Sequence, residues 1–387
     1  MNLQNLIEIM EAQMQQRRNI DDNSYPIRVA HLMTYMNYGG VEAVIMNYYR
    51  HIDRTMIQFD FFVFEGSELP QRDEIESLGG RIYILPEVKH LGQYENTLTR
   101  ILKKNHYRIV HANMNTLSVF GLRAAKKAGV PVRICHSHST AGAGETKKNI
   151  LKYILRPFSR IYPTELFACS EYAGHWLYGK KTDFYVMHNA IDLEHFRYNE
   201  VIRHRIREEL GIDNKLVIGH IGRFTPPKND FFILEIFNEI HMMNPESVMM
   251  FIGEGQLEGE VRQRVNELNL TDSVLFLGTK NDCAPYYQAM DAFLLPSLYE
   301  GLPVVGVEAQ AAGLTCFFSD KVTTEVKVLD TTEMISLDIN AKFWAKKILI
   351  NTRQYKREDT VKKMKKGGYS IYEESDTLRE KYLESLQ

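Results

Sequence analysis

Residues 216–243 read LVIGHIGRFTPPKNDFFILEIFNEIHMM: a short apolar run, a polar loop, and a longer stretch with helical spacing. A continuous apolar run of this length is typical of a buried strand in a parallel sheet. The same order recurs along the chain, with seven such runs before residue 190 and five after residue 214. The alternation predicts an α/β fold whose parallel sheets are covered by helices on both faces.

The number of strands predicts two domains, because a single open sheet rarely holds about twelve strands. The natural break is the charged segment 189–214, which precedes the run LVIGHIG. We therefore expect two Rossmann-like, doubly wound domains that face each other across a cleft, with ligands at the carboxyl ends of the strands. The expected parts are an N-terminal helical extension at 1–27, a first domain at 28–195, a second domain at 196–364, and a C-terminal helix at 365–387. The first domain is one surface on which this C-terminal helix could pack.

Composition excludes several classes of protein. The 387 residues are 44% hydrophobic and 25% charged, which is typical of chains that form buried cores. The 47 basic and 49 acidic residues nearly balance, which argues against a protein that mainly coats nucleic acid. No apolar run reaches the length of a membrane span, and the N-terminus lacks the pattern of a secretory signal. We expect a cytoplasmic protein that binds no nucleic acid.

The loop after the run LVIGHIG carries two cations, Arg223 and Lys228. Asn229 or Asp230 can cap the helix that follows. The helix dipole, the free backbone N–H groups and the two side-chain charges all favour an anion at this place. The pattern predicts a diphosphate site, although spacing alone leaves two solvated surface charges equally open.

The segment LLPSLYEGLPVVGVEAQAAG at 294–313 places two carboxylates around the start of another helix. Gly301 permits close approach of the backbone, and Pro303 suits the first helical turn. Glu300 stands just before this helix, and Glu308 lies inside it among small and apolar residues. Because a glutamate is rarely buried unpaired, the hydroxyl groups of a ribose or sugar are expected partners of Glu308. A solvated stripe on the helix is the alternative.

Two further loops follow strand-like runs. Gly39 and Gly40 form either a turn whose amides meet a phosphate or acceptor, or an ordinary strand-to-helix turn. We expect His136 and His138 to point to opposite faces, so that one enters the cleft; two ordinary strand-end histidines are the more frequent alternative. Neither these histidines nor the four cysteines show the spacing of zinc ligands, so no metal site is predicted.

The segment KKNILKYILRPFSR at 147–160 combines an apolar stripe with basic residues. The stripe consists of Ile150, Leu151, Ile154, Leu155 and Phe158. A basic amphipathic segment of this kind can lie on an anionic membrane. The more frequent alternative is a helix that packs on its own domain with its polar face in solvent.

Taken together, GRFTPPKN at 222–229, EGLPVVGVE at 300–308 and the glycine pair after the first strand resemble the retaining glycosyltransferases of family 4, which have the GT-B fold. The two carboxylates match the E-x7-E motif of that family. YGGVE at 38–42 and ICHSHST at 134–140 make the chain most similar to bacterial enzymes of capsular or exopolysaccharide assembly. One departure is the tract 320–338, which lacks the glycine-rich ending that many members place near the donor.

The resemblance implies a role for each site residue. Arg223 and Lys228 would hold the donor diphosphate and stabilise the charge on the leaving group. Glu300 and His138 would contact the transferred sugar, and these four residues are the expected catalytic set. Glu308 would accept hydrogen bonds from the ribose hydroxyl groups.

Backbone groups and one loop complete the expected donor site. The N–H groups of Gly301 and Leu302 would face the sugar or phosphate. Gly39 and Gly40 would border the diphosphate from the opposite domain. The loop from Thr279 to Asp282 would border the base.

The implied reaction is retaining transfer of a hexose-type sugar from a nucleotide-diphosphate donor, with a UDP-sugar as the default. The expected acceptor is a growing glycan, in particular a lipid-linked intermediate. The leaving phosphate would take the proton of the incoming hydroxyl, and the protein would act by positioning and by charge. No Asp-x-Asp motif stands at a strand end, so no metal or other cofactor is expected.

The expected location includes peripheral contact with the inner face of the cell membrane through residues 147–160. Three alternatives stay open. They are a nucleotide-sugar epimerase of the same fold, a phosphorylase, for which the chain shows no pyridoxal-binding signature, and a non-catalytic module that binds sugar nucleotides.

Overall fold

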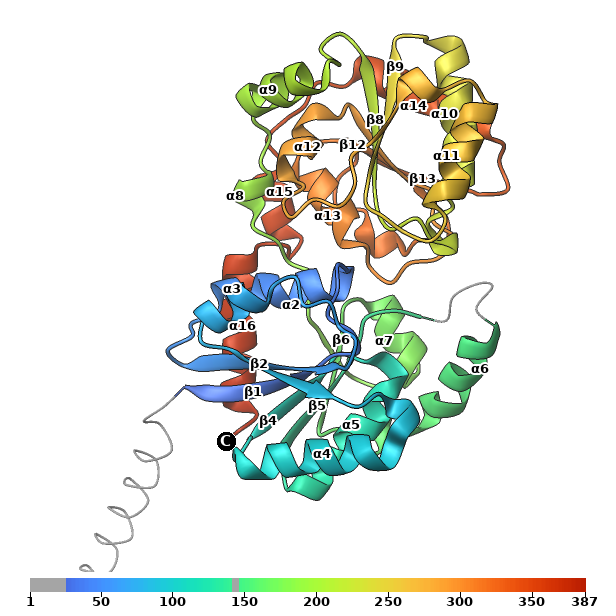
Figure 1. The fold of residues 1–387 in the computed structure, drawn as a ribbon. Helices are drawn as coiled ribbons and strands as arrows, with labels where there is room; N and C mark the ends of the chain where they lie inside the picture. The colour runs from blue at the N-terminus through green and yellow to red at the C-terminus, as the bar shows by residue number, and fades with distance from the viewer. Residues whose placement is uncertain (1–25, 141–145) are drawn as a thin grey trace, which may run out of the picture.

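The computed structural model describes residues 26–140 and 146–387, which form two parallel sheets one above the other (Figure 1). The first sheet has the order β3-β2-β1-β4-β5-β6-β7, and the second has the order β10-β9-β8-β11-β12-β13. The predicted α/β class with parallel sheets is therefore confirmed. The strands are β1 (Ile27–Leu32), β2 (Ile57–Phe64), β3 (Arg81–Leu85), β4 (Ile109–Ala112), β5 (Val132–Ser137), β6 (Glu165–Ala168), β7 (Tyr185–Val186), β8 (Leu216–Ile221), β9 (Ser247–Ile252), β10 (Val274–Phe276), β11 (Ala292–Leu295), β12 (Thr315–Ser319) and β13 (Thr332–Ile335).

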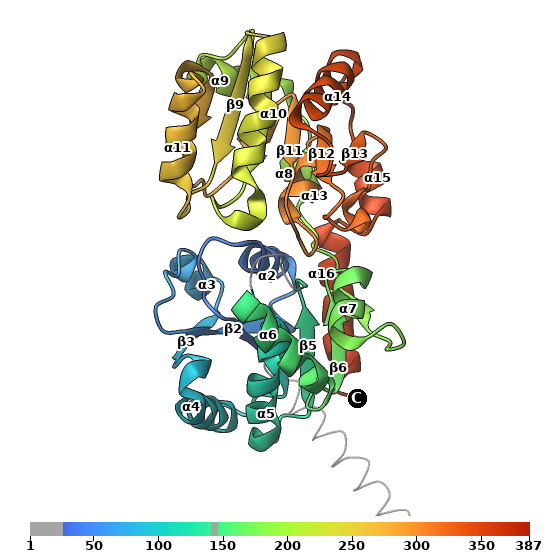
Figure 2. The ribbon, with the colours of Figure 1, turned by 90° about the vertical axis from the view of Figure 1, so that its right-hand side faces the viewer.

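Helices cover both faces of each sheet, as the two orthogonal views show (Figures 1 and 2). Those that follow strands of the first sheet are α2 (Gly40–His51), α3 (Arg72–Ser77), α4 (Leu91–Lys104), α5 (Ser118–Ala128), α6 (Thr146–Leu155) and α7 (Glu171–Tyr178). The helices that come after β7 along the chain are α8 (Leu193–Phe196), α9 (Glu200–Leu210), α10 (Asp230–Met243), α11 (Glu258–Glu267), α12 (Ala284–Ala289), α13 (Val304–Ala311), α14 (Ala341–Gln354), α15 (Val361–Lys366) and α16 (Ile371–Glu384).

The central strands are buried along their whole length, which is why they read as continuous apolar runs. Every residue of β2, β9, β11 and β12 is buried. The one carboxylate in β2, Asp60, is satisfied by Arg28 and by the hydroxyl of Tyr107, both at 2.6 Å. Strand β13 was not predicted, because two of its four residues are polar or charged and it lies at the sheet edge, where burial is incomplete.

The chain crosses between the two halves twice. Helices α8 and α9 occupy the predicted break between β7 and β8. On the return, Ser370 pairs with Ile191, and α16 packs against α2 of the first half, where Figure 1 shows it in red. The expected boundary after residue 364 falls inside α15, and the return crossing lies a few residues later.

The predicted N-terminal helix lies outside the described residues. All four cysteines are free thiols. Within residues 26–140 and 146–387, no helix combines the length and the apolar character needed to cross a membrane.

Candidate active site

Loops at the carboxyl ends of strands from both sheets meet between the two halves. Gly301, which follows β11, lies so close to the backbone carbonyl of His138, which follows β5, that no Cβ atom would fit. Gly40, at the start of α2, lies 3.9 Å from the side chain of Val304, at the start of α13, measured from the position a Cβ atom would take. The N-termini of α2 and α13 therefore lie close together, and Gly40 and Gly301 stand at contacts between the two halves.

Lys228 and Glu300 form the centre of this region. Lys228 ends the short 3-10 helix η4 (Pro226–Lys228), and its Nζ donates to Oε1 of Glu300 at 2.6 Å. The hydroxyl of Ser297 donates to the same oxygen at 3.0 Å. The two side chains are only 18% and 17% exposed. The predicted diphosphate cation and the predicted sugar carboxylate are thus in direct contact and form an ion pair.

The adjacency of β8 and β11 explains this pairing, because it places their two strand-end loops side by side. The backbone N–H of Leu298 donates to the carbonyl of Pro227 at 2.8 Å. The side chain of Asn229 donates to the carbonyl of Pro296 at 3.1 Å. These bonds hold the two loops together whether or not the ion pair is formed.

Arg223 is exposed, and among the described residues it makes no ion pair. Its charge acts on Glu42, in the first turn of α2. Burial raises the pKa of Glu42, and the nearby guanidinium of Arg223 lowers it in part. The carboxylate of Glu42 folds back against Gly39. Sequence reasoning missed Glu42, which stands two residues after the glycine pair.

Glu308 lies half-buried in α13 and accepts a hydrogen bond from the hydroxyl of Tyr287 at 2.8 Å. Burial raises the pKa of Glu308 to about 7. Asp282 raises this pKa further, and His195 opposes that effect. His195 and Asp282 are themselves 2.9 Å apart. Tyr287 and His195 were not predicted, because neither stands in a recognisable motif.

The loop from Thr279 to Asp282 borders the same region. Asp282 caps the start of α12 by accepting from the N–H of Ala284 at 2.9 Å. Asn281 accepts a hydrogen bond from the hydroxyl of Tyr38 in the first half at 3.2 Å. This predicted base-side loop is therefore another place where the two halves touch.

His138 is 7% exposed, and its Nε2 lies 3.0 Å from Oδ1 of Asn113. Burial lowers the pKa of His138 to about 3, so the ring is neutral near pH 7 and donates from Nε2. The expectation that His136 and His138 point to opposite faces was wrong. Residues two apart in a strand share a face, and the two rings stack with centroids 3.8 Å apart.

A buried histidine cluster extends from His138 into the first half. It comprises His31, His111, His136 and His138. His111 bonds to His136 at 3.0 Å and to the hydroxyl of Tyr382 in α16 at 2.7 Å. The C-terminal helix therefore reaches the same network as the predicted cleft histidine. No sequence signal distinguished His31 and His111 from ordinary strand residues.

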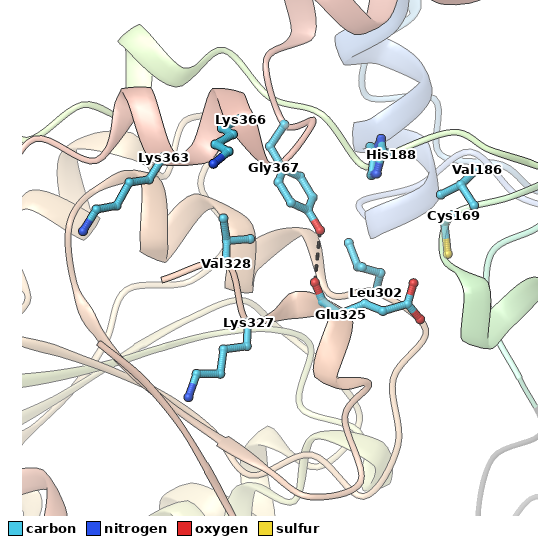
Figure 3. A pocket seen from close by; sticks show the side chains of 11 residues that line it. Cys169, Val186, His188, Leu302, Glu325, Lys327, Val328, Lys363, Lys366 and Gly367 are labelled. Carbon is cyan, nitrogen blue, oxygen red and sulfur yellow. Dashed lines mark hydrogen bonds between the residues drawn. The ribbon is translucent and has the colours of Figure 1, made fainter. Parts of the chain in front are cut away.

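A cavity of about 500 Å³ lies between the halves on the side of the chain crossings (Figure 3). Of the predicted site residues it contains only Leu302. It is lined by Cys169, Val186, His188, Leu302, Glu325, Lys327, Val328, Lys363, Lys366, Gly367 and Tyr369. The cavity is thus adjacent to the predicted donor site but distinct from the Lys228–Glu300 pair. In the described part of the chain, no three His, Cys, Asp or Glu side chains are grouped to hold a metal ion.

Comparison with protein families matches both halves of the chain. Residues 38–195 match the model described as Glycosyltransferase Family 4, and residues 202–366 match the model described as Glycosyl transferases group 1. EpsF of Bacillus subtilis is 36% identical over 339 residues, which cover 84% of this chain and 88% of EpsF.

More distant relatives have more specific names. One is the UDP-Gal:alpha-D-GlcNAc-diphosphoundecaprenol alpha-1,3-galactosyltransferase of Escherichia coli, 28% identical over 76% of this chain and 79% of that enzyme. Another is the capsular polysaccharide biosynthesis glycosyltransferase CapH of Staphylococcus aureus, 26% identical over 83% of this chain and 90% of CapH. The crystal structure of Anabaena HepE in complex with UDP-glucose superposes with a TM-score of 0.78 and 16% identity, covering 92% of this chain and 99% of HepE. This likeness shows the GT-B fold.

Proposed function

Because this chain belongs to the glycosyltransferases that these two family models describe, we propose that it moves a hexose-type sugar from a nucleotide-diphosphate donor to a lipid-linked glycan, with retention of anomeric configuration. The observation that carries the proposal is the Lys228–Glu300 pair, which lies where the strand-end loops of the two halves meet. UDP is the proposed nucleotide, since the names of the E. coli relative and of the HepE complex both contain it. The name of CapH supports capsular polysaccharide assembly, and the name of the E. coli enzyme, which contains diphosphoundecaprenol, supports a lipid-linked acceptor.

The donor diphosphate would replace Glu300 as the partner of the Lys228 ammonium group. Glu300 would then be free to accept hydrogen bonds from hydroxyl groups of the sugar. Arg223, which has no ion-pair partner in the described structure, would supply a second positive charge to the diphosphate. The N-termini of α2 and α13 add partial positive charge from both halves. This arrangement favours negative charge on the leaving group, which is where it builds up in the transition state.

In the proposed transfer, the bond between the anomeric carbon and the diphosphate oxygen breaks, and its electron pair stays with the leaving diphosphate. The acceptor hydroxyl oxygen bonds to the anomeric carbon on the same face. Its proton passes to an oxygen of the leaving phosphate, so no protein carboxylate acts as the base. Glu300 and His138 would position the sugar, and a bound metal is not part of this scheme.

The nucleoside end of the donor would lie at Glu308. One oxygen of its carboxylate already accepts from Tyr287, which leaves the other for a ribose hydroxyl. The loop from Thr279 to Asp282, close to Glu308 through Asp282, would border the base.

The surface of α6 and of the 3-10 helix η3 (Arg156–Arg160) supports the proposal that the acceptor is lipid-linked. Figure 2 shows α6 on the outer surface of the first half, facing the viewer. Of the predicted apolar stripe, Leu155 is buried, and the other four residues are exposed. The exposed apolar residues here are Ile150, Leu151, Tyr153, Ile154, Phe158 and Ile161. Together with the neighbouring Arg156 and Arg160, these residues would bind the anionic inner face of the cell membrane.

The test is donor turnover with and without acceptor. A panel of nucleotide sugars is first screened by thermal shift, because a ligand that binds only the folded state raises apparent stability. The best donor is then incubated with membranes that contain lipid-linked glycans, with and without EDTA, and the product anomer is determined by NMR. Nucleoside diphosphate released only with acceptor supports transfer. Conversion of the donor without release would indicate an epimerase, and binding without turnover would indicate a binding module.

A further inference from the structure

The N-terminus of α7 is capped by a residue from the other half of the chain. The first N–H groups of a helix have no partner within it. The N–H of Ala173 is satisfied locally by the hydroxyl of Ser170 at 3.1 Å. The N–H groups of Glu171 and Tyr172 donate to the two carboxylate oxygens of Glu325, at 2.7 and 2.8 Å. A single carboxylate thus completes the cap across the interface, where the helix dipole also favours a negative charge.

Glu325 is held in the orientation that this contact requires. It lies in the 3-10 helix η6 (Thr324–Val326), after β12. The hydroxyl of Thr323 donates to its carboxylate at 3.1 Å, and the hydroxyl of Tyr369 donates to its backbone carbonyl at 3.3 Å. In Figure 3 the carboxylate of Glu325 extends toward the strand end at Cys169, whereas Lys327 extends away from it. The cavity lysines are therefore not its partners.

The cap lies next to the contacts that bring the predicted catalytic residues together. Cys169, just before α7, is 3.5 Å from the backbone carbonyl of His138. The same carbonyl lies against Gly301, the residue after Glu300. The buried side chain of Asn189 donates to the carbonyl of Leu302 at 2.7 Å. A continuous series of contacts therefore joins the α7 cap to the turn that carries Glu300.

We propose that Glu325 is a positioning residue for sugar transfer: by capping α7 across the interface, it holds the His138 end of β5 against the turn at Gly301. The proposal rests on the proposed function. Separation of the two halves must break both hydrogen bonds of Glu325 and expose two uncapped N–H groups. The capped arrangement is therefore the closed form, in which both halves contribute to the donor site.

The experiment compares Glu325→Ala and Glu325→Gln with Ser170→Ala. The serine variant is the matched control, since it removes a cap from the same helix but no contact between the halves. Amide hydrogen exchange follows the first turn of α7, small-angle X-ray scattering follows the separation of the halves, and donor kinetics give kcat and KM. Thermal melting confirms that each variant is folded.

For Glu325→Ala we expect at least tenfold faster exchange at Glu171 and Tyr172 and a larger radius of gyration. We also expect about a tenfold fall in kcat/KM, equivalent to about 1.4 kcal/mol. Glu325→Gln keeps one acceptor oxygen and should lie between Glu325→Ala and the wild type. Ser170→Ala should lose protection at Ala173 alone, with an unchanged radius and kcat/KM within twofold of the wild type.

Three results would overturn the proposal. Unchanged exchange in Glu325→Ala would mean that the contact is not formed in solution. Faster exchange with unchanged radius and kinetics would reduce Glu325 to a helix cap. An equal loss of activity in Ser170→Ala would assign the effect to helix stability. A failure of the proposed function has a different signature, namely a wild-type protein that turns over no donor, and the exchange and scattering measurements do not depend on it.

Discussion

Replacing Lys228 with alanine gives the most direct test of the catalytic scheme. Its ammonium group lies 2.6 Å from a carboxylate oxygen of Glu300. In the proposed Michaelis complex it would face the donor diphosphate instead. Removing one preorganised group that stabilises transition-state charge lowers kcat by about 100- to 1,000-fold, or roughly 2.7–4 kcal/mol. We expect Lys228→Ala to lose activity in this range.

The effect on stability should be much smaller. Surface ion pairs contribute about 0–1 kcal/mol, and breaking a fully buried pair costs about 3–5 kcal/mol. With both side chains less than one-fifth exposed, the pair lies between these limits. After the substitution Glu300 keeps the hydrogen bond from Ser297. We therefore expect a loss of about 1–2 kcal/mol in the free energy of unfolding, and a protein that stays folded at assay temperature.

The assay is the initial rate of nucleoside diphosphate release at saturating donor, with urea unfolding measured on the same samples. Lys215→Ala is the matched control, because Lys215 forms a 2.5 Å ion pair with Glu246 at the opposite end of β8. Activity of Lys228→Ala within threefold of the wild type would refute the diphosphate role. An equal loss in Lys215→Ala would show that the assay reports a general effect of lost ion pairs. Adding Glu300→Gln to Lys228→Ala should recover stability without recovering activity.

Three further predictions concern other parts of the molecule. The free energy of unfolding should fall as the pH drops from 7 to 5. A histidine such as His138, with a pKa of about 3, stays neutral in the folded state, whereas an unfolded histidine gains a proton near pH 6.5. Each such histidine should lower the free energy of unfolding by about 1 kcal/mol per pH unit. Five buried histidines act in this direction, and three carboxyl groups with raised pKa, those of Glu42, Asp230 and Glu308, oppose them. Urea midpoints that do not change between pH 7 and 5 would contradict the reasoning. Donor affinity measured by calorimetry should weaken below pH 7, up to about tenfold per pH unit, because Glu308, whose pKa is about 7, accepts hydrogen bonds from hydroxyl groups best as a carboxylate. Glu308→Gln should remove this pH dependence. An unchanged pH profile in that variant would exclude Glu308 as the source of the dependence. The double variant Ile150→Glu, Ile154→Glu should bind anionic vesicles at least about tenfold more weakly than the wild type in a sedimentation assay. Val201→Glu, which changes an exposed apolar residue on α9, should bind like the wild type. Equal binding by the wild type and both variants would exclude α6 as the membrane contact.

Much of the candidate site was predictable because short motifs carry their own local geometry. Arg223 and Lys228 follow a strand and precede a helix, and the structure places both in that turn. The spacing of Glu300 and Glu308 places one before α13 and the other inside it. Glu42, Tyr287 and His195 were not predictable in this way, since each acts through a residue that is distant in sequence.

By itself, the amino-acid sequence determined the parallel α/β class and the strand-end turns, because the burial of strands and the start of helices depend on neighbouring residues. Only the tertiary structure decided which turns meet. The order of strands in a sheet is not their order along the chain, and the adjacency of β8 and β11 is what joins Lys228 to Glu300, 72 residues later. The same reason applies to Glu325, in a tract that the sequence marked only as a departure from the family. Its contact with α7 depends on how two separately formed halves pack, which no local pattern encodes.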